Sequence, residues 1–174
     1  MNTKRKKIFI ITLVVITFFV LLYIVYMVYA TVSGAPFVPT RNRNVVKMIE
    51  LANLTGAEKT IDLGSGEGRI VFAAAPYCAQ TVGVEINPFL YWISRLKQRV
   101  SNHKNVFFIR DSLWKINLAP YDVVFIYFIP HRMQKLAEKI KKEMKPGSRV
   151  VSHAFTFFDW PIAKKDGSIY VYVV

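Results

Sequence analysis

The chain has 174 residues, which is enough for one domain and an appended segment. It contains 24 Lys and Arg residues against 11 Asp and Glu, a formal net charge of +13 that favours anionic partners: lipid headgroups, nucleic acid or an acidic protein face. An ordinary solvated surface is the alternative. Its one cysteine, Cys78, excludes an internal disulfide and has no Cys or His neighbours at metal-ligand spacing.

Residues 1–7 form a basic N-terminus with Lys4 to Lys7 in sequence, and residues 8–29 form an uncharged, almost wholly apolar run. About 20 such residues cross a bilayer as a helix. Tyr23, Tyr26 and Tyr29 resemble an interfacial aromatic belt. We therefore predict a transmembrane helix over 8–29. Cleavage of a signal peptide near Ala35 is an alternative, although the run is long for one.

Residues 30–43 are predicted to be a linker, because Pro36 and Pro39 disfavour helix. A domain over 44–174 follows. Asn44 is predicted to cap its first helix, which has an apolar face over 45–52 and ends near Gly56.

The stretch from Lys59 to Arg69 is predicted to be a strand, a turn with three alternating glycines, and the start of a helix. The glycines are Gly64, Gly66 and Gly68. Their spacing is not that of a dinucleotide fingerprint, and no Gly-Lys-Ser/Thr of a P-loop follows. Asp62 would repel phosphate and favour a cationic ligand. An ordinary strand-to-helix turn is the alternative.

A second strand is predicted over Thr81–Ile86, with Glu85 near its end, where a carboxylate can accept hydrogen bonds from ribose hydroxyls. Asn87 and Pro88 suit the start of a helix. Its residues at helical spacing are predicted to face the sheet: Phe89, Ile93, Leu96 and Val100.

The rest of the chain continues the alternation of strand and helix. Strands are predicted over 106–109, 121–129 and 149–154, a helix over 131–144, and a hairpin turn before a last strand over 169–174. We therefore expect a doubly wound, mostly parallel Rossmann-like α/β sheet, with the ligand at the carboxyl ends of the strands. Asp62, Glu85 and Asp111 follow three successive strands and should converge there.

These motifs, Asp62-Leu-Gly-Ser-Gly-Glu-Gly68, Val82-Gly-Val-Glu-Ile-Asn-Pro88 and Asp111-Ser-Leu-Trp114, resemble the class I S-adenosylmethionine-dependent methyltransferases. With the N-terminal span and Pro36-Phe-Val-Pro-Thr40, they are most similar to the small membrane-anchored protein-lysine methyltransferases that modify the ATP synthase c-subunit and the adenine nucleotide translocase. The resemblance implies S-adenosylmethionine as cofactor, and no metal is expected because the sequence shows no cluster of metal ligands. The residues expected at the cofactor are Thr40, Asp62, Gly64, Gly66, Gly68, Glu85, Asn87, Asp111 and Ser112.

A lysine acceptor must arrive deprotonated, so we expect a desolvated, aromatic-lined substrate channel after the fourth and fifth strands. Its candidate walls, each of which could equally be a core residue, are Tyr127, Phe128, Pro130, Phe155 and Trp160. Phe128 stands where the family has a small residue, which affects the acceptor more than the cofactor. The residues show no general base. His103, His131 and His153 are scattered and more often lie on surfaces or at caps.

We expect a single-pass membrane protein that methylates a membrane-associated protein, with its domain on the side that contains S-adenosylmethionine, in the cytoplasm or the mitochondrial matrix. The Lys4–Lys7 cluster favours a cytoplasmic N-terminus, but Arg41, Arg43 and Lys47 compete for that side. A helix that enters the membrane without crossing it would resolve the conflict. An RNA methyltransferase and a tethered, non-enzymatic cofactor-binding scaffold are the alternatives. Nucleic acid is the less favoured partner, because no nucleic-acid-binding appendage or adenine-type motif is present.

Overall fold

The computed structural model describes residues 3–33 and 38–174, with side-chain surroundings for 4–25 and 38–174. The chain divides into two compact units, 1–37 and 38–174, each described by itself. Residues 34–37 of the predicted linker, with Pro36 and Phe37, lie outside the described residues. So do the surroundings of Tyr26 and Tyr29 in the predicted aromatic belt.

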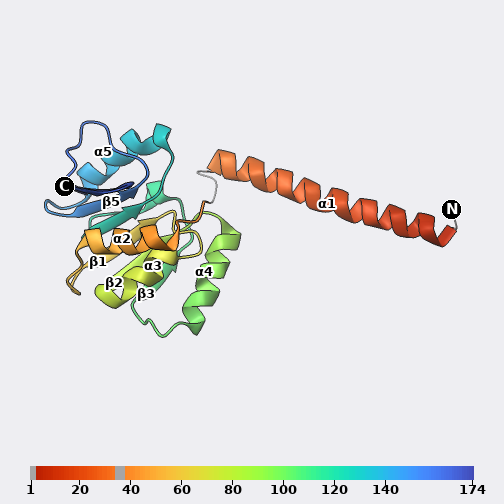
Figure 1. Cartoon of the computed structure of the whole chain (residues 1–174), viewed down its shortest axis with the longest axis horizontal. Helices are drawn as coiled ribbons and strands as arrows, with labels where there is room; N and C mark the ends of the chain where they lie inside the picture. The colour runs from red at the N-terminus through yellow and green to blue at the C-terminus, as the bar shows by residue number, and fades with distance from the viewer. Residues whose placement is uncertain (1–2, 34–37) are drawn as a thin grey trace. The chain divides into compact units, whose positions relative to one another are not determined.

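The first unit is one helix, α1 (Thr3–Ser33), which begins in the basic cluster and runs past the predicted end at residue 29 (Figure 1). Lys4–Val25 is long and apolar enough to cross a membrane, a test that an N-terminal signal sequence also passes. Thr12 and Thr17 each donate a hydroxyl hydrogen bond to the carbonyl four residues earlier, at 3.0 and 2.9 Å. Their hydroxyls therefore need no water.

The second unit is built on a seven-stranded sheet in the order β3-β2-β1-β4-β5-β7-β6. The first five strands pair in parallel, and β7 and β6 add an antiparallel hairpin at one edge. The strands are β1 (Lys59–Leu63), β2 (Gln80–Val84), β3 (Val106–Ile109), β4 (Val123–Ile126), β5 (Arg149–His153), β6 (Lys164–Asp166) and β7 (Ile169–Val173). The predicted mostly parallel α/β sheet and its final hairpin are confirmed.

Helices connect these strands (Figure 1). They are α2 (Asn42–Ala52), α3 (Arg69–Ala74), α4 (Pro88–Val100) and α5 (Met133–Glu143), with short 3-10 turns η1 (Ala75–Tyr77), η2 (Leu113–Lys115) and η3 (Pro130–Arg132). From β1 the chain moves to one edge through β2 and β3, and from β4 it moves toward the other through β5. Right-handed crossovers therefore place α3 and α4 on one face and α5 on the other.

The face under α2 and α3 holds one apolar core. Met48 and Ala52 of α2 and Ala74 of α3 pack there with Phe125 of β4 and Val151 of β5. Strand alternation points Val124 and Ile126 to the opposite face, where they are also fully buried. Strand β4 lies between β1 and β5 in the middle of the sheet, which explains why it is apolar on both faces.

Two predictions about helices are wrong. Asn44 does not cap α2: the helix begins at Asn42 after Arg41, and the Asn44 side chain contacts His153 instead. Helix α4 does not bury the predicted face. Leu90 and Ser94 are its buried residues, whereas Phe89, Leu96 and Val100 are exposed. Apolar spacing locates a stripe on a helix but not the side that packs.

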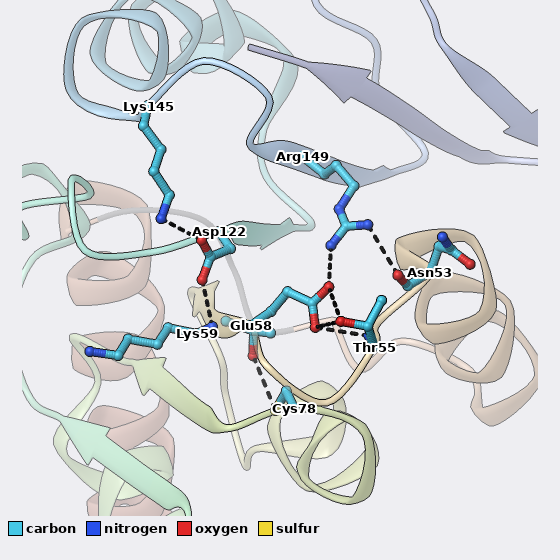
Figure 2. Close-up of polar contacts among 9 residues, drawn as sticks. Asn53, Thr55, Glu58, Lys59, Cys78, Asp122, Lys145 and Arg149 are labelled. Carbon is cyan, nitrogen blue, oxygen red and sulfur yellow. Dashed lines mark hydrogen bonds and ion pairs between the residues drawn. The ribbon is translucent and has the colours of Figure 1, made fainter.

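The starts of three strands are tied together by charged groups (Figure 2). Arg149 of β5 donates to the Glu58 carboxylate at 2.8 Å and to the Asn53 carbonyl at 3.0 Å. Asp122, just before β4, accepts from the Lys59 amide at 2.8 Å and pairs with Lys145 at 2.5 Å. This network lies at the amino ends of the strands, so it leaves the carboxyl ends for a ligand.

Candidate functional site

The turn after β1 has a backbone that requires glycine. Gly64, Gly66 and Gly68 have φ values of 88°, 54° and 89°, in the left-handed region that side chains disfavour. A Cβ on Gly64 would meet nothing within 4 Å, whereas one on Gly68 would lie 2.6 Å from the Phe108 ring. Gly64 therefore faces open space, and Gly68 allows the turn to pack against β3.

Asp62 lies near the carboxyl end of β1, and Glu85 directly follows the last residue of the neighbouring strand β2. Asp62 is 4% exposed and Glu85 7% exposed. The Glu85 carboxylate accepts hydrogen bonds from the amides of Gly66 at 2.8 Å and Asn87 at 2.7 Å. Glu85 thus joins the glycine turn to the start of α4.

Burial raises the pKa of both carboxyl groups. Burial, and then the charge of Glu85, raise the pKa of Asp62 to about 8. Burial also raises the pKa of Glu85, although the amides of Asn87 and Gly66 oppose the shift. No Lys or Arg among residues 38–174 forms an ion pair with either group. A cationic ligand would favour their charged forms, because an opposite charge nearby stabilises the carboxylate.

Asn87 and Thr40 occupy supporting positions. Asn87 caps α4, and its side-chain oxygen accepts from the amides of Phe89 at 2.9 Å and Leu90 at 3.3 Å. Thr40 is buried, and its carbonyl accepts from Arg69 at 3.4 Å. Glu67 in the glycine turn forms ion pairs with Arg69 and, at 2.5 Å, with Lys97 of α4.

Asp111 and Ser112 follow β3, the third strand to end at this edge. The Asp111 carboxylate accepts from the Ser112 amide at 2.7 Å and lies 3.7 Å from the Lys115 ammonium. The Ser112 hydroxyl accepts from the Trp114 amide at 3.4 Å and begins η2. Asp111 is only half-buried, so its carboxylate keeps room for another partner.

The predicted channel residues do not all lie in one place. Tyr127 lies after β4, with its ring centroid 4.4 Å from that of His153 and 6.4 Å from that of Phe155, with which it stacks. Pro130 is exposed and begins η3. These residues follow β4 and β5, so they stand at the edge that carries the acidic groups.

Trp160 does not stand there. Its indole donates to the Val173 carbonyl at 3.0 Å and packs on Phe157 and Tyr172. Val173 pairs with Arg149 at the amino end of β5, so Trp160 lies at the end of the sheet away from the glycine turn. The prediction of Trp160 as a channel wall is therefore wrong, because order along the chain did not show how the segment between β5 and β6 returns.

His153, which the sequence analysis expected on a surface or at a cap, is instead a buried residue and a further candidate for the site. It ends β5 and is buried, and its Nε2 lies 3.0 Å from the Asn44 amide nitrogen. Burial lowers the pKa of His153, and its Nδ1 has no hydrogen-bond partner among the described residues. Its position near the carboxyl end of the strand predicted over 149–154 was the signal, the same one that identified Asp62 and Glu85.

Comparisons with known proteins show which family the chain belongs to. Residues 62–164 match the family model of the ANTKMT methyltransferase domain. The chain belongs to this family. No group of three or more His, Cys, Asp or Glu that could hold a metal occurs in the described part of the chain.

Individual members of the family and one solved structure are similar over most of the second unit. The Rattus norvegicus lysine N-methyltransferase named for the C subunit of ATP synthase is 40% identical over 129 residues, which cover 72% of this chain and 58% of the rat protein. A protein-lysine N-methyltransferase of Saccharolobus islandicus is 31% identical, covering 82% and 96%. The chain therefore spans little more than half of the rat protein but nearly all of the archaeal one.

The solved structure is an RNA methyltransferase of Salinibacter ruber in complex with S-adenosyl-L-homocysteine. It has a TM-score of 0.74 and 32% sequence identity, covering 78% of this chain and 93% of the other. The methyltransferase fold is thus shown by both sequence and structure.

Proposed function

We propose that this chain is an S-adenosylmethionine-dependent protein-lysine N-methyltransferase whose substrate is a membrane-associated protein. The observation that carries the proposal is the buried pair of carboxyl groups, Asp62 and Glu85, beside a left-handed glycine turn in a chain of this family. A cofactor with a sulfonium and an ammonium group fits a pair that lacks an ion-pair partner in residues 38–174. Relatives named for lysine methylation of the C subunit of ATP synthase support the choice of acceptor.

The residues that would hold the cofactor are those at the carboxyl ends of the parallel strands. Asp62 offers negative charge beside the open face of Gly64, and Glu85 offers carboxylate lone pairs next to Gly66. Asn87, Asp111, Ser112 and Thr40 would complete the border. When bound, the cofactor supplies a methyl group on sulfur. The protein would orient the acceptor toward that methyl group and exclude water from the site.

Tyr127, Phe155 and Pro130 would border the acceptor lysine. A lysine must lose its proton before its nitrogen can attack, and a desolvated aromatic channel lowers the pKa of an amine. The pKa of His153 is itself lowered by burial, so an uncharged imidazole stands behind the Tyr127 ring. This arrangement would not repel an incoming cation as an imidazolium would.

We further propose that α1 is a single-pass anchor and that the domain lies on the side of the membrane that contains the cofactor, in the cytoplasm or the mitochondrial matrix. The length and composition of Lys4–Val25 support this. Anionic lipid is the expected surface partner, since 38–174 carries 20 Lys and Arg against 11 Asp and Glu.

RNA is the second candidate acceptor. The Salinibacter ruber structure, described as an RNA methyltransferase, is 32% identical and nearly fully covered, and the basic surface would suit RNA. The lysine methyltransferases remain the better guide, because several of them match and the family model bears the name of one.

Two measurements test the proposal. Calorimetry on the full chain in detergent should show cofactor binding that Glu85→Ala weakens by about 1–3 kcal/mol, the loss expected when hydrogen bonds to a charged group are removed. Glu138→Gln, a change at an exposed carboxylate of α5, is the matched control and should bind as the wild type does.

The acceptor is tested with membranes from a strain that lacks the protein, incubated with the purified chain and labelled cofactor. Label that protease removes, and that hydrolysis assigns to methyl-lysine, supports the proposal. Label removed by ribonuclease alone would instead establish the RNA alternative.

A further inference from the structure

Helix α4 carries an exposed apolar stripe. Phe89, Trp92, Leu96 and Val100 are 69%, 61%, 64% and 79% exposed. Their spacing of three, four and four residues places them on one side of the helix. The opposite side, with Leu90 and Ser94, is buried in the domain. The solvent-exposed side of a surface helix is normally polar. Packing within the domain therefore does not explain this apolar stripe.

The stripe is bordered by cations. At 100° per residue, Lys97 falls on one side of it and Arg99 and Arg95 fall on the other. From Ile86 to Arg110 the chain has five Lys or Arg residues and no Asp or Glu. Apolar side chains between flanking cations are the pattern of a helix that lies in the interface of an anionic bilayer.

We infer that α4 docks the domain on an anionic lipid bilayer by inserting the stripe Phe89, Trp92, Leu96 and Val100 between phospholipid headgroups. The inference needs the proposed membrane tether only to bring the domain near the bilayer. It does not depend on the acceptor or on catalysis.

Charge favours lipid over other occupants of the stripe. In a two-fold dimer the same patch meets itself, so each copy would bring the three cations of α4, Arg95, Lys97 and Arg99, against the same three of the other copy. A protein partner would need an apolar groove with an acidic rim. An anionic bilayer offers both an apolar interior and negative charge, at about 1 kcal/mol for each well-placed Lys or Arg.

Docking would act close to the cofactor site. The stripe begins two residues after Asn87, whose amide donates to Glu85 at 2.7 Å. Lys97, at its border, pairs with Glu67 of the glycine turn at 2.5 Å. A bilayer bound to α4 would therefore lie against the helix that supports the cofactor residues.

Trp92 is the reporter. The full chain is placed in vesicles of phosphatidylcholine and phosphatidylglycerol whose acyl chains are brominated, and tryptophan emission is compared with that in unbrominated vesicles. Trp114 and Trp160 are the other tryptophans, and α1 has none, so Trp92→Phe isolates the signal. We expect strong quenching in the wild type that Trp92→Phe removes and that replacing phosphatidylglycerol by phosphatidylcholine diminishes.

Leu96→Glu should abolish the quenching of Trp92. Tyr77→Glu, which adds the same charge at an exposed aromatic residue outside α4, should retain it. Cofactor binding is measured in the same samples, so loss of the methyltransferase function shows separately from loss of docking.

Equal emission in brominated and plain vesicles overturns the inference. So does a dimer in which Trp92 is shielded from acrylamide but not quenched by bromine, which would assign the stripe to a second copy. An unquenched Trp92 with methylation lost in Leu96→Glu would assign it to the protein substrate.

Discussion

Asp62 and Glu85 show how burial sets the properties of the site at the scale of single residues. A buried acid near a second buried acid holds its proton to higher pH than usual, and in this protein the pKa of Asp62 is raised to about 8. A bound cation would reverse the shift, so binding should release a proton near neutral pH. The site therefore couples ligand charge to pH.

We predict that Asp62→Asn raises the melting temperature of the ligand-free protein. The unfolded carboxyl ionises near 3.8, whereas the folded one keeps its proton up to about 8. The contribution of Asp62 to stability is therefore fully present below 3.8 and falls as the pH rises through 8. The variant should gain most at the upper end of this window, and Glu138→Gln should gain nothing in the same thermal melts. An equal gain at all pH values would contradict the assignment.

Gly64 and Gly147 form a matched pair for a second prediction. Both are left-handed, with φ values of 88° and 84°, and a Cβ on either would meet nothing within 4 Å. Alanine at either position should lower the free energy of unfolding by about 1–2 kcal/mol through backbone strain alone. Only Gly64→Ala should also weaken cofactor binding, as measured by calorimetry. Equal binding by both variants would separate Gly64 from the cofactor.

At the scale of elements, the two ends of the sheet have separate tasks. The amino ends of β1, β4 and β5 are tied by Glu58, Asp122 and Arg149, and the carboxyl ends bear the candidate site. Burial alone would raise the pKa of Glu58, but hydrogen bonds from the Thr55 amide and the Arg149 guanidinium outweigh it and hold the pKa at about 2. The network should therefore support stability without touching the ligand.

Glu58→Gln should lower the free energy of unfolding by about 1–3 kcal/mol at neutral pH, because it weakens a charged hydrogen bond and removes the negative charge that pairs with Arg149. The stabilisation by Glu58 is present above its unfolded pKa of 4.5 and is lost as the pH falls through about 2. The variant and the wild type should therefore converge in acid. Urea titrations at several pH values measure this, with cofactor affinity unchanged. A variant that also lost cofactor affinity would show that the two ends are not independent.

At the scale of the whole molecule, α1 belongs to one compact unit, residues 1–37, and the domain is another, residues 38–174. Four residues of the sequence, 34–37, follow α1 before the domain begins. A bridge of four residues reaches at most about 14 Å when fully extended. If α1 spans the bilayer, the domain cannot move far from the lipid surface. A short tether would thus raise the local concentration of membrane-bound acceptors.

We predict that alkaline carbonate leaves the full-length protein in the membrane pellet and that deletion of residues 1–33 releases it. The reason is the length of the apolar part of α1, from Lys4 to Val25. Intact mass spectrometry of the pelleted protein is the control, because a signal peptide would be missing from it. A shortened product in the supernatant would support cleavage instead of anchoring.

The sequence alone determined the features that depend on neighbours along the chain. The glycine turn, the cap at Asn87, the succession of strands and helices along the chain, and the acidic residues at the strand ends could all be predicted. Each rests on local backbone preference or on strand and helix periodicity. The parallel sheet followed from that alternation, and the convergence of Asp62 and Glu85 followed from the sheet.

Only the tertiary structure decided which side of an element is buried and where a connection returns. An apolar stripe on α4 could pack inward or face out, since periodicity is the same in both cases, and it faces out. The segment after β5 carries Trp160 to the far end of the sheet, because its hairpin pairs antiparallel to β5. His153 and Asn44 meet across 109 residues. Such pairs depend on how distant elements pack, so no local pattern in the sequence could reveal them.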